Sequence, residues 1–363
     1  MTTTTPATST AVRTTPQDLF SQLSGADAHL TYEQLRRETP VRPIDLPTGV
    51  TGWLVTRYDD ARAALTDPRI SKGTTDSPAG TRTGLPPDLW QAVSRHMLAT
   101  DPPDHARLRR VVAAAFTARR VEALQPRVQE ITAELLAGMT GRDRLDLINE
   151  LAFPLPNRVF CELLGVPSAD RTSFRAWSNI IVSGIAARDE LPGAYMSILG
   201  YVRQLIEFKR VNPVDDLLSA LVAVSDDGDR LTRDELSSTV LLLLIAGHET
   251  TVNLIGNGAY LLLTHLDQWD RLRAGPALLP NAIEEFLRYE SPAHLATSRV
   301  TTAEVELGGQ TIPAGAPVLI SLLSANRDEA RFAEPQRFDI GRKPTPHLAL
   351  GHRVNHCLGA PLA

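Results

Sequence analysis

Cysteine is scarce in this sequence, which has only Cys161 and Cys357 among 363 residues. Two thiols cannot build a disulfide framework, and they cannot supply the four thiolates that an iron–sulfur cluster needs. Cys161 lies in an apolar helical pattern, "NRVFCELLGV", where a free cysteine is most simply a buried core residue. This cysteine usage fits a reducing compartment, so we expect a cytoplasmic protein.

The sequence also has no basic excess and no long apolar run. Lys and Arg number 37 against 42 Asp and Glu, a formal net charge of −5, which argues against nucleic acid as the main partner. The longest apolar run, "VLLLLIAG", ends at Gly247 and is too short for a membrane anchor. Residues 1–16 are rich in threonine and lack the apolar core of a secretory signal. We expect them to form a disordered tail.

Most of the remaining sequence has helical periodicity. From Pro103 to about His265, apolar residues recur every three or four positions. Shorter patterns predict a strand at 52–57, a helix at 279–290 and strand-like pieces between 303 and 323. No internal repeat or interdomain linker is visible. We therefore predict a mainly α fold with a minor β part, forming a single domain over residues 17–363.

One predicted helix is unusually long. Thr232 and Glu235 form a capping box, and the periodicity continues for over thirty residues, roughly 50 Å at 1.5 Å per residue. Its middle holds "AGHETT", residues 246–251. A glycine there costs about 1 kcal/mol, and threonine hydroxyls can bond to the carbonyl one turn earlier. This segment is either a kink that relieves packing or a polar notch that binds a small ligand.

Cys357 lies in "GHRVNHCLG", near the end of the sequence. If "LGAPLA" opens a helix, the helix dipole and free N–H groups lower the pKa of the thiol. A thiolate held in this way suits axial ligation of haem iron. Zinc is the competing interpretation, because His352, His356 and Cys357 are suitable ligand types. No second Cys/His cluster completes a tetrahedral zinc site.

Several charged residues are suited to binding carboxylates or to pairing with each other. His105 and Arg109, in "DPPDHARLRR", lie four residues apart on one helical face, and Arg299 precedes the predicted strands. Glu285 and Arg288 have the spacing of an ion pair within a helix. Each of these signals alone is typical of ordinary surface charge.

Taken in order, "DPPDHARLR", "AGHETT", "EEFLR", "PQRF" and "GHRVNHCLG" resemble the motifs of the cytochrome P-450 monooxygenases. The resemblance is to the soluble bacterial type found in antibiotic and macrolide pathways, and it covers Thr31 to Ala363. It implies the cytochrome P-450 fold, lacking the remainder of the C-terminal helix and a β-hairpin. The implied cofactor is haem b, iron protoporphyrin IX. The implied activity inserts one oxygen atom of O2 into a hydrophobic natural product similar to a polyketide or macrolide.

The resemblance also implies a role for individual residues. Cys357 is the axial ligand of the haem iron, and Glu249 with Thr250 is the acid–alcohol pair that delivers protons. Glu285, Arg288 and Arg337 form a structural triad. Leu295 and Ala296 line the substrate pocket. The remaining residues expected to contact the haem are His96, His105, Arg109, Ala246, Gly247, Arg299, Asn355 and Gly359.

The ligand loop departs from the family pattern at three positions. Leu350 replaces an aromatic residue, Arg353 replaces a glycine, and Asn355 replaces a basic residue. If position 353 has a positive φ, arginine is strained there by about 1 kcal/mol or more. A degenerate, non-catalytic relative that acts as a binding or recruitment module is therefore the alternative function.

Electrons must come from another protein, because no dinucleotide fingerprint is visible. Gly256 and Gly258 lie within the long helix and not in a strand–helix turn. A ferredoxin and its ferredoxin reductase are the expected donors. Arg107 and Arg110 are either a docking face for an acidic ferredoxin or an ordinary solvated basic face.

Overall fold

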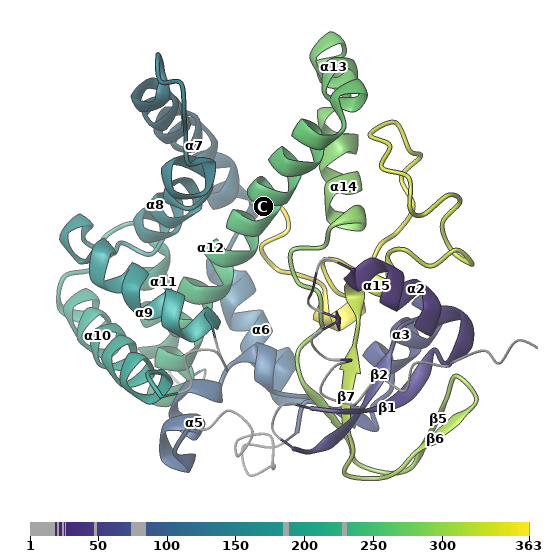
Figure 1. The fold of residues 1–363 in the computed structure, drawn as a ribbon. Coiled ribbons are helices and arrows are strands. Elements are labelled where there is room, and N and C mark those ends of the chain that lie inside the picture. The colour runs from purple at the N-terminus through teal and green to yellow at the C-terminus, as the bar shows by residue number, and fades with distance from the viewer. Residues whose placement is uncertain are drawn as a thin grey trace, which may run out of the picture.

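A computed structural model of the chain describes residues 19, 22–23, 25, 27–46, 49–73, 85–183, 189–226 and 231–362. The predicted disordered tail, residues 1–16, lies outside the described residues. Helices dominate one part of the molecule, and a small sheet with a few helices forms the other part (Figure 1). This arrangement confirms the prediction of a mainly α fold with a minor β part.

The helical part follows the periodicity of the sequence between Pro103 and His265, with α5 before it and α13 and α14 after it. The predicted helix at 279–290 is α14. The bounds of these elements are α5 Pro87–Ser94, α6 Asp104–Ala115, α7 Ala118–Met139, α8 Pro154–Leu163, α9 Arg171–Ser183, α10 Leu191–Val211, α11 Leu217–Asp226, α12 Arg233–Thr264, α13 Leu266–Ala274 and α14 Leu279–Tyr289.

Helix α12 begins and ends where the sequence predicts. The Thr232 hydroxyl accepts a hydrogen bond from the Glu235 backbone N–H at 3.2 Å, and Glu235 Oε2 accepts one from the Thr232 N–H at 2.7 Å. The helix runs without interruption through "AGHETT" to Thr264. By length and composition α12 could cross a membrane, but half of its most apolar window is buried inside the protein. Helices α5, α8, α10, α11 and α14 pack around it, so α12 occupies the position of a core helix.

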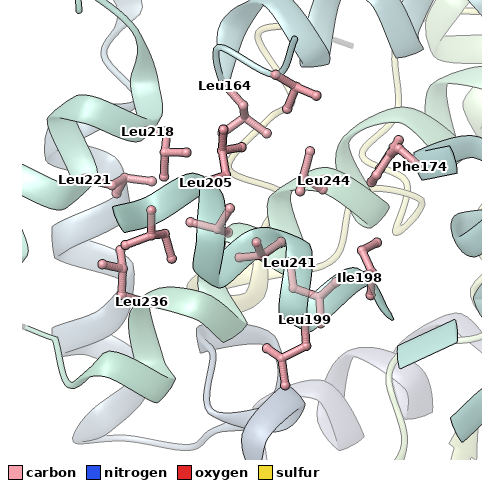
Figure 2. Close-up of a cluster of buried hydrophobic side chains, with 14 of the residues drawn as sticks. Leu164, Phe174, Ile198, Leu199, Leu205, Leu218, Leu221, Leu236, Leu241 and Leu244 are labelled. Carbon is pink, nitrogen blue, oxygen red and sulfur yellow. The ribbon is translucent and has the colours of Figure 1, made fainter. Parts of the chain in front are cut away.

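The larger hydrophobic core lies among these helices. Its side chains come mainly from α8 to α12, at the three- and four-residue spacing of the sequence. Figure 2 shows Leu205, Leu241 and Leu244 pointing into this core from α10 and α12. Cys161 on α8 belongs to the same core and is 1% exposed, which confirms its prediction as a buried thiol.

The sheet part holds five strands in the order β1-β2-β7-β4-β3. Strand β2 pairs in parallel with β7, and the other neighbours are antiparallel. Strands β5 and β6 form a separate hairpin. The strand bounds are β1 Val41–Asp45, β2 Thr51–Val55, β3 Ile70–Ser71, β4 Arg299–Thr301, β5 Val305–Leu307, β6 Gln310–Ile312 and β7 Pro317–Ile320.

Three further helices cover the sheet part: α2 Ala28–Glu38, α3 Tyr58–Thr66 and α15 Leu322–Ala325. The core beneath them includes Val55, Leu65, Val318 and Ile320. Leu348 is 1% exposed in this core, and its N–H donates to Asn326 Oδ1 at 2.6 Å. The loop that carries Cys357 thus begins from a fixed point in the sheet part. Figure 1 shows this C-terminal segment, in yellow, lying between α12 and the sheet part.

Candidate functional site

The middle of α12 presents two different faces. Ala246 and Thr250, one turn apart, are both exposed, and the Thr250 hydroxyl donates to the Ala246 carbonyl at 3.0 Å. This bond is the back-bonding that the sequence suggests for a threonine within a helix. Glu249 is half-buried, and burial raises the pKa of its carboxyl group above the usual value. An acid with a raised pKa beside an exposed hydroxyl is suited to passing protons.

The opposite face of α12 is closed. His248 is fully buried, its Nδ1 lies 2.7 Å from the Leu244 carbonyl oxygen, and its ring packs edge-on against Phe153 and Phe174. A Cβ atom on Gly247 would lie 2.1 Å from Cε1 of Phe160 on α8. Gly247 therefore lets α8 approach α12 closely and does not share the exposed face of Ala246 and Thr250. Its role as a haem contact remains a prediction, as does that of Ala246.

Four residues that the resemblance implies as carboxylate partners gather at one place. His105 and Arg109 project from α6, Arg299 belongs to β4, and His96 lies between α5 and the short helix η1 Met97–Ala99. Burial, and then the charges of Lys72, Arg109 and Arg299, lower the pKa of His105. Burial likewise lowers the pKa of His96 to about 4, so both imidazoles are neutral at pH 7.

These residues have unused hydrogen-bonding capacity. Within the part of the chain that the structure describes, His96 Nδ1 and Arg299 Nε are buried without a hydrogen-bond partner. Among the described residues, the side chain of Arg299 makes one hydrogen bond, a 3.3 Å contact from Nη1 to the Ile70 carbonyl oxygen. Buried donors without partners are costly in a finished structure. Because Arg299 is a cation, a carboxylate such as a haem propionate is a suitable partner for this cluster.

Lys72 is a member of this cluster that the sequence reasoning missed. It follows β3 and is 8% exposed. Burial, and then the charge of Arg299, lower the pKa of its ammonium group to about 8. A lone lysine in "RISKG" carries no local signal, because the partners that define its environment lie far away in the sequence.

The Cys357 loop is a tight turn. The N–H of Cys357 donates to the Leu350 carbonyl at 2.7 Å, which closes the loop between them. Gly351 has φ of +80°, and a Cβ there would lie 2.4 Å from the Asn355 carbonyl oxygen. The Cys357 side chain is exposed, as an incoming metal centre requires. Residues 358–362 form turns in place of the helix expected at "LGAPLA".

The departures in the loop have structural consequences. Arg353 has φ of +49°, which confirms that arginine occupies a backbone conformation favoured by glycine. Leu350 is partly buried against the cluster formed by α12, α14 and Phe338. Asn355 is half-buried, and its N–H donates to the His352 carbonyl at 3.1 Å. Its side-chain contact with a haem remains a prediction. A Cβ on Gly359 would lie 3.8 Å from the Cys357 sulfur, an ordinary contact distance.

The zinc interpretation has no geometric support. No group of three or more His, Cys, Asp or Glu residues in the described ranges could hold a metal ion. His352 and His356 flank the loop, but they do not converge with Cys357 on one point. The described residues therefore offer one exposed thiol at Cys357 and a cluster of cations formed by Lys72, Arg109 and Arg299.

The structural triad is present with one member different from the prediction. Both carboxylate oxygens of Glu285 accept hydrogen bonds from Arg288, at 2.7 and 2.8 Å, and both side chains are 2% exposed. The prediction of Arg337 as third member is wrong, because its guanidinium is exposed and pairs with Glu334 at 3.5 Å. Arg342 takes that position, with Nε 3.2 Å from both carboxylate oxygens of Glu285. Arg337 contributes only its carbonyl.

Leu295 and Ala296 lie on the segment that joins α14 to β4. Leu295 forms a bridge with Ser321, and the N–H of Ala296 donates to the Ile320 carbonyl at 2.9 Å. Both side chains are half-buried, and Ala296 packs against the core of the sheet part. Their lining of a substrate pocket remains a prediction.

Comparisons with known proteins identify the family. A family model described as Cytochrome P450 matches residues 277–345. The chain is 48% identical over 355 residues to Cytochrome P450 107B1 from Saccharopolyspora erythraea, covering 95% of this chain and 85% of the relative. It is 44% identical over 358 residues to 6-deoxyerythronolide B hydroxylase from the same organism, covering 96% and 88%.

The solved structures agree. The tirandamycin C-bound P450 monooxygenase TamI superimposes with a TM-score of 0.85 and 44% identity, over 93% of this chain and 86% of TamI. These matches define an oxidoreductase of a class whose family implies a haem cofactor. The chain belongs to the cytochrome P450 family, and it is a P450 monooxygenase of the bacterial antibiotic-pathway type.

Proposed function

We propose that this chain is a haem-thiolate monooxygenase that inserts one oxygen atom of O2 into a hydrophobic natural product of the polyketide or macrolide class. Two electrons and two protons balance the reaction, and the second oxygen atom leaves as water. Two observations carry the proposal: the Cys357 thiol is exposed, and Arg299 Nε and His96 Nδ1 are buried without a hydrogen-bond partner among the described residues. Relatives named for 6-deoxyerythronolide B and tirandamycin C support the substrate class.

In this proposal, the protein supplies a ligand, an orientation and a proton path. Bound haem activates dioxygen for insertion into a C–H or C=C bond, and Cys357 donates its thiolate to the iron. Haem b is the form proposed from the family resemblance, and its two carboxylates match the cations Arg109 and Arg299. His96, His105 and Asn355 are the remaining proposed partners of those carboxylates.

Glu249 and Thr250 are the proposed proton-delivery pair. The Thr250 hydroxyl already donates to the Ala246 carbonyl, so its oxygen is free to accept a hydrogen bond from a water or from another donor in front of α12. The raised pKa of Glu249 keeps its proton affinity closer to neutral pH than that of a solvated carboxylate. Leu295 and Ala296 are proposed to hold the apolar substrate near this pair.

A ferredoxin with its reductase is the proposed source of electrons, and the cytoplasm is the proposed location. Arg107 is a poor docking residue, because it forms ion pairs with Asp104 and Glu235. Arg110 is exposed on the same helix α6, and it remains the proposed docking residue for an acidic ferredoxin.

The test of this function is turnover with isotopically labelled dioxygen. The purified protein is supplied with a ferredoxin, its reductase and a panel of macrolactone substrates, and the products are analysed by mass spectrometry. The proposal expects one labelled oxygen atom in the product and one in water. Electron consumption without any oxygenated product across the panel would contradict it.

A non-catalytic relative is the second candidate, and the strained Arg353 favours it. In that case the protein binds the same hydrophobic compounds but reduces no dioxygen in their presence. Calorimetric binding of a macrolactone without any consumption of dioxygen would support this second function.

A further inference from the structure

Lys72 is a buried lysine with no assigned role in this protein. It is 8% exposed, and none of the hydrogen bonds or ion pairs of the described residues involves its ammonium group. The other buried lysine of the chain, Lys209, is paired with the carboxylate of Asp216. Burying a charge without a partner costs free energy, so the burial of each lysine needs a structural reason. Lys209 is explained by its neighbour, and Lys72 is not.

The sheet places Lys72 directly against another cation. Ile70 pairs with Thr301 and Ser71 pairs with Val300 in the antiparallel ladder of β3 and β4. Continuing this register by one residue sets Lys72 opposite Arg299, and both side chains are buried. Like charges directly opposite each other destabilise a sheet. The fold therefore holds two cations together where neither stabilises the other.

The surroundings do not neutralise these charges. Arg109 adds a third cation from α6, and His96 and His105 are neutral at pH 7. Among the described residues, Asp101 is the one carboxylate that interacts electrostatically with this group. Its Oδ2 already accepts hydrogen bonds from the Ser71 hydroxyl and from the Lys72 backbone N–H. The cluster thus has a net charge of two positive units, which matches one dianion.

We propose that Lys72 is a haem-binding residue, whose ammonium group pairs with a propionate carboxylate at the place where it meets Arg299 and Arg109. This inference rests on the proposed haem-dependent function and adds a residue to it. The ammonium group is one hydrogen-bonding partner for the dianion, and the guanidinium groups are others. The lowered pKa of Lys72 agrees with this role, because burial and the charge of Arg299 disfavour its ammonium form and a neighbouring anion would stabilise it.

The test measures haem release from the holo-protein. Wild type, Lys72→Met and Lys72→Gln are loaded with haem, and transfer to excess apomyoglobin gives the release rate. We expect both Lys72 variants to release haem at least about tenfold faster than wild type. This factor corresponds to the loss of one hydrogen bond between charged groups. Lys343→Met is the matched control, because Lys343 is an exposed lysine elsewhere. It should release haem at the wild-type rate.

Haem dimethyl ester separates pairing with a carboxylate from a merely structural role. The esters carry no carboxylate, so wild type and Lys72→Met should release this compound at equal rates. The proposal would be overturned if Lys72→Met released the dimethyl ester faster than wild type by the same factor as it releases haem. It would also be overturned by release of haem from Lys72→Met at the wild-type rate. A wild-type chain that takes up no haem would overturn the proposed function as well, which distinguishes the two failures.

Discussion

Replacement of Arg342 by methionine tests the charged network beneath the Cys357 loop. Glu285 is 2% exposed and accepts from Arg288, from the N–H of Asp339 at 3.1 Å and from Arg342 Nε at 3.2 Å. Arg342→Met removes one charged hydrogen bond from a buried carboxylate, a loss of about 1.5–3 kcal/mol. Its guanidinium also binds the carbonyls of Ala333, Glu334 and Arg337, which become solvated when it is removed. We therefore expect the free energy of unfolding to fall by about 2 kcal/mol.

Arg337→Met is the matched control for this experiment. Arg337 differs from Arg342 in that its guanidinium is exposed and forms an ion pair with the exposed carboxylate of Glu334. We expect its substitution to change the free energy of unfolding by less than about 0.5 kcal/mol. Urea denaturation of the holo-protein, followed by circular dichroism, measures both variants against wild type. The assignment of Arg342 to the triad would be refuted if Arg337→Met lost as much stability as Arg342→Met.

Three further predictions concern the site itself. Thr250→Ala should keep haem, but its electron use should no longer be coupled to product, so peroxide forms. Thr251 is the control, because its hydroxyl lies 3.5 Å from the Gly247 carbonyl oxygen, and Thr251→Ala should keep electron use coupled to product. Measurements of NADPH consumed, peroxide formed and product formed check both variants. Gly247→Ala should lower stability by about 1–3 kcal/mol through overlap with Phe160, and Phe160→Leu should restore part of it in a denaturation assay. Pairing with a dianion raises the pKa of Lys72 from about 8, so haem binding should be fully strengthened below pH 8 and weaken as the pH rises through the bound-state pKa. Haem release from Lys72→Met, which has no ammonium group to titrate, should lack this pH dependence.

Features encoded within one helix were predictable from the sequence. The capping box at Thr232 fixes the start of α12, and three-residue spacing places Glu285 beside Arg288. The family pattern predicted strain at Arg353 if its φ is positive, and its φ is +49°. These predictions succeeded because short-range geometry alone decides them.

Features that depend on distant segments were missed. Arg342 reaches Glu285 from 57 residues away, and only the path of the loop after Phe338 decides that Arg342 points there while Arg337 does not. Strands β1, β3 and β4 are short and carry no clear alternation, so their pairing depends on long-range register. The place of Lys72 in the cationic cluster could not be predicted for the same reason. Its environment is created by Arg299, more than two hundred residues further along the chain.

The central claim is that Cys357 is the thiolate ligand of a bound haem. The reduced carbon-monoxide difference spectrum of the purified chain tests it most directly, with Cys357→His as the comparison. We predict the red-shifted Soret band of a thiolate-ligated haem in wild type and the band of a nitrogen-ligated haem in the variant. Absence of the thiolate band from a wild-type chain that has taken up haem would contradict the account.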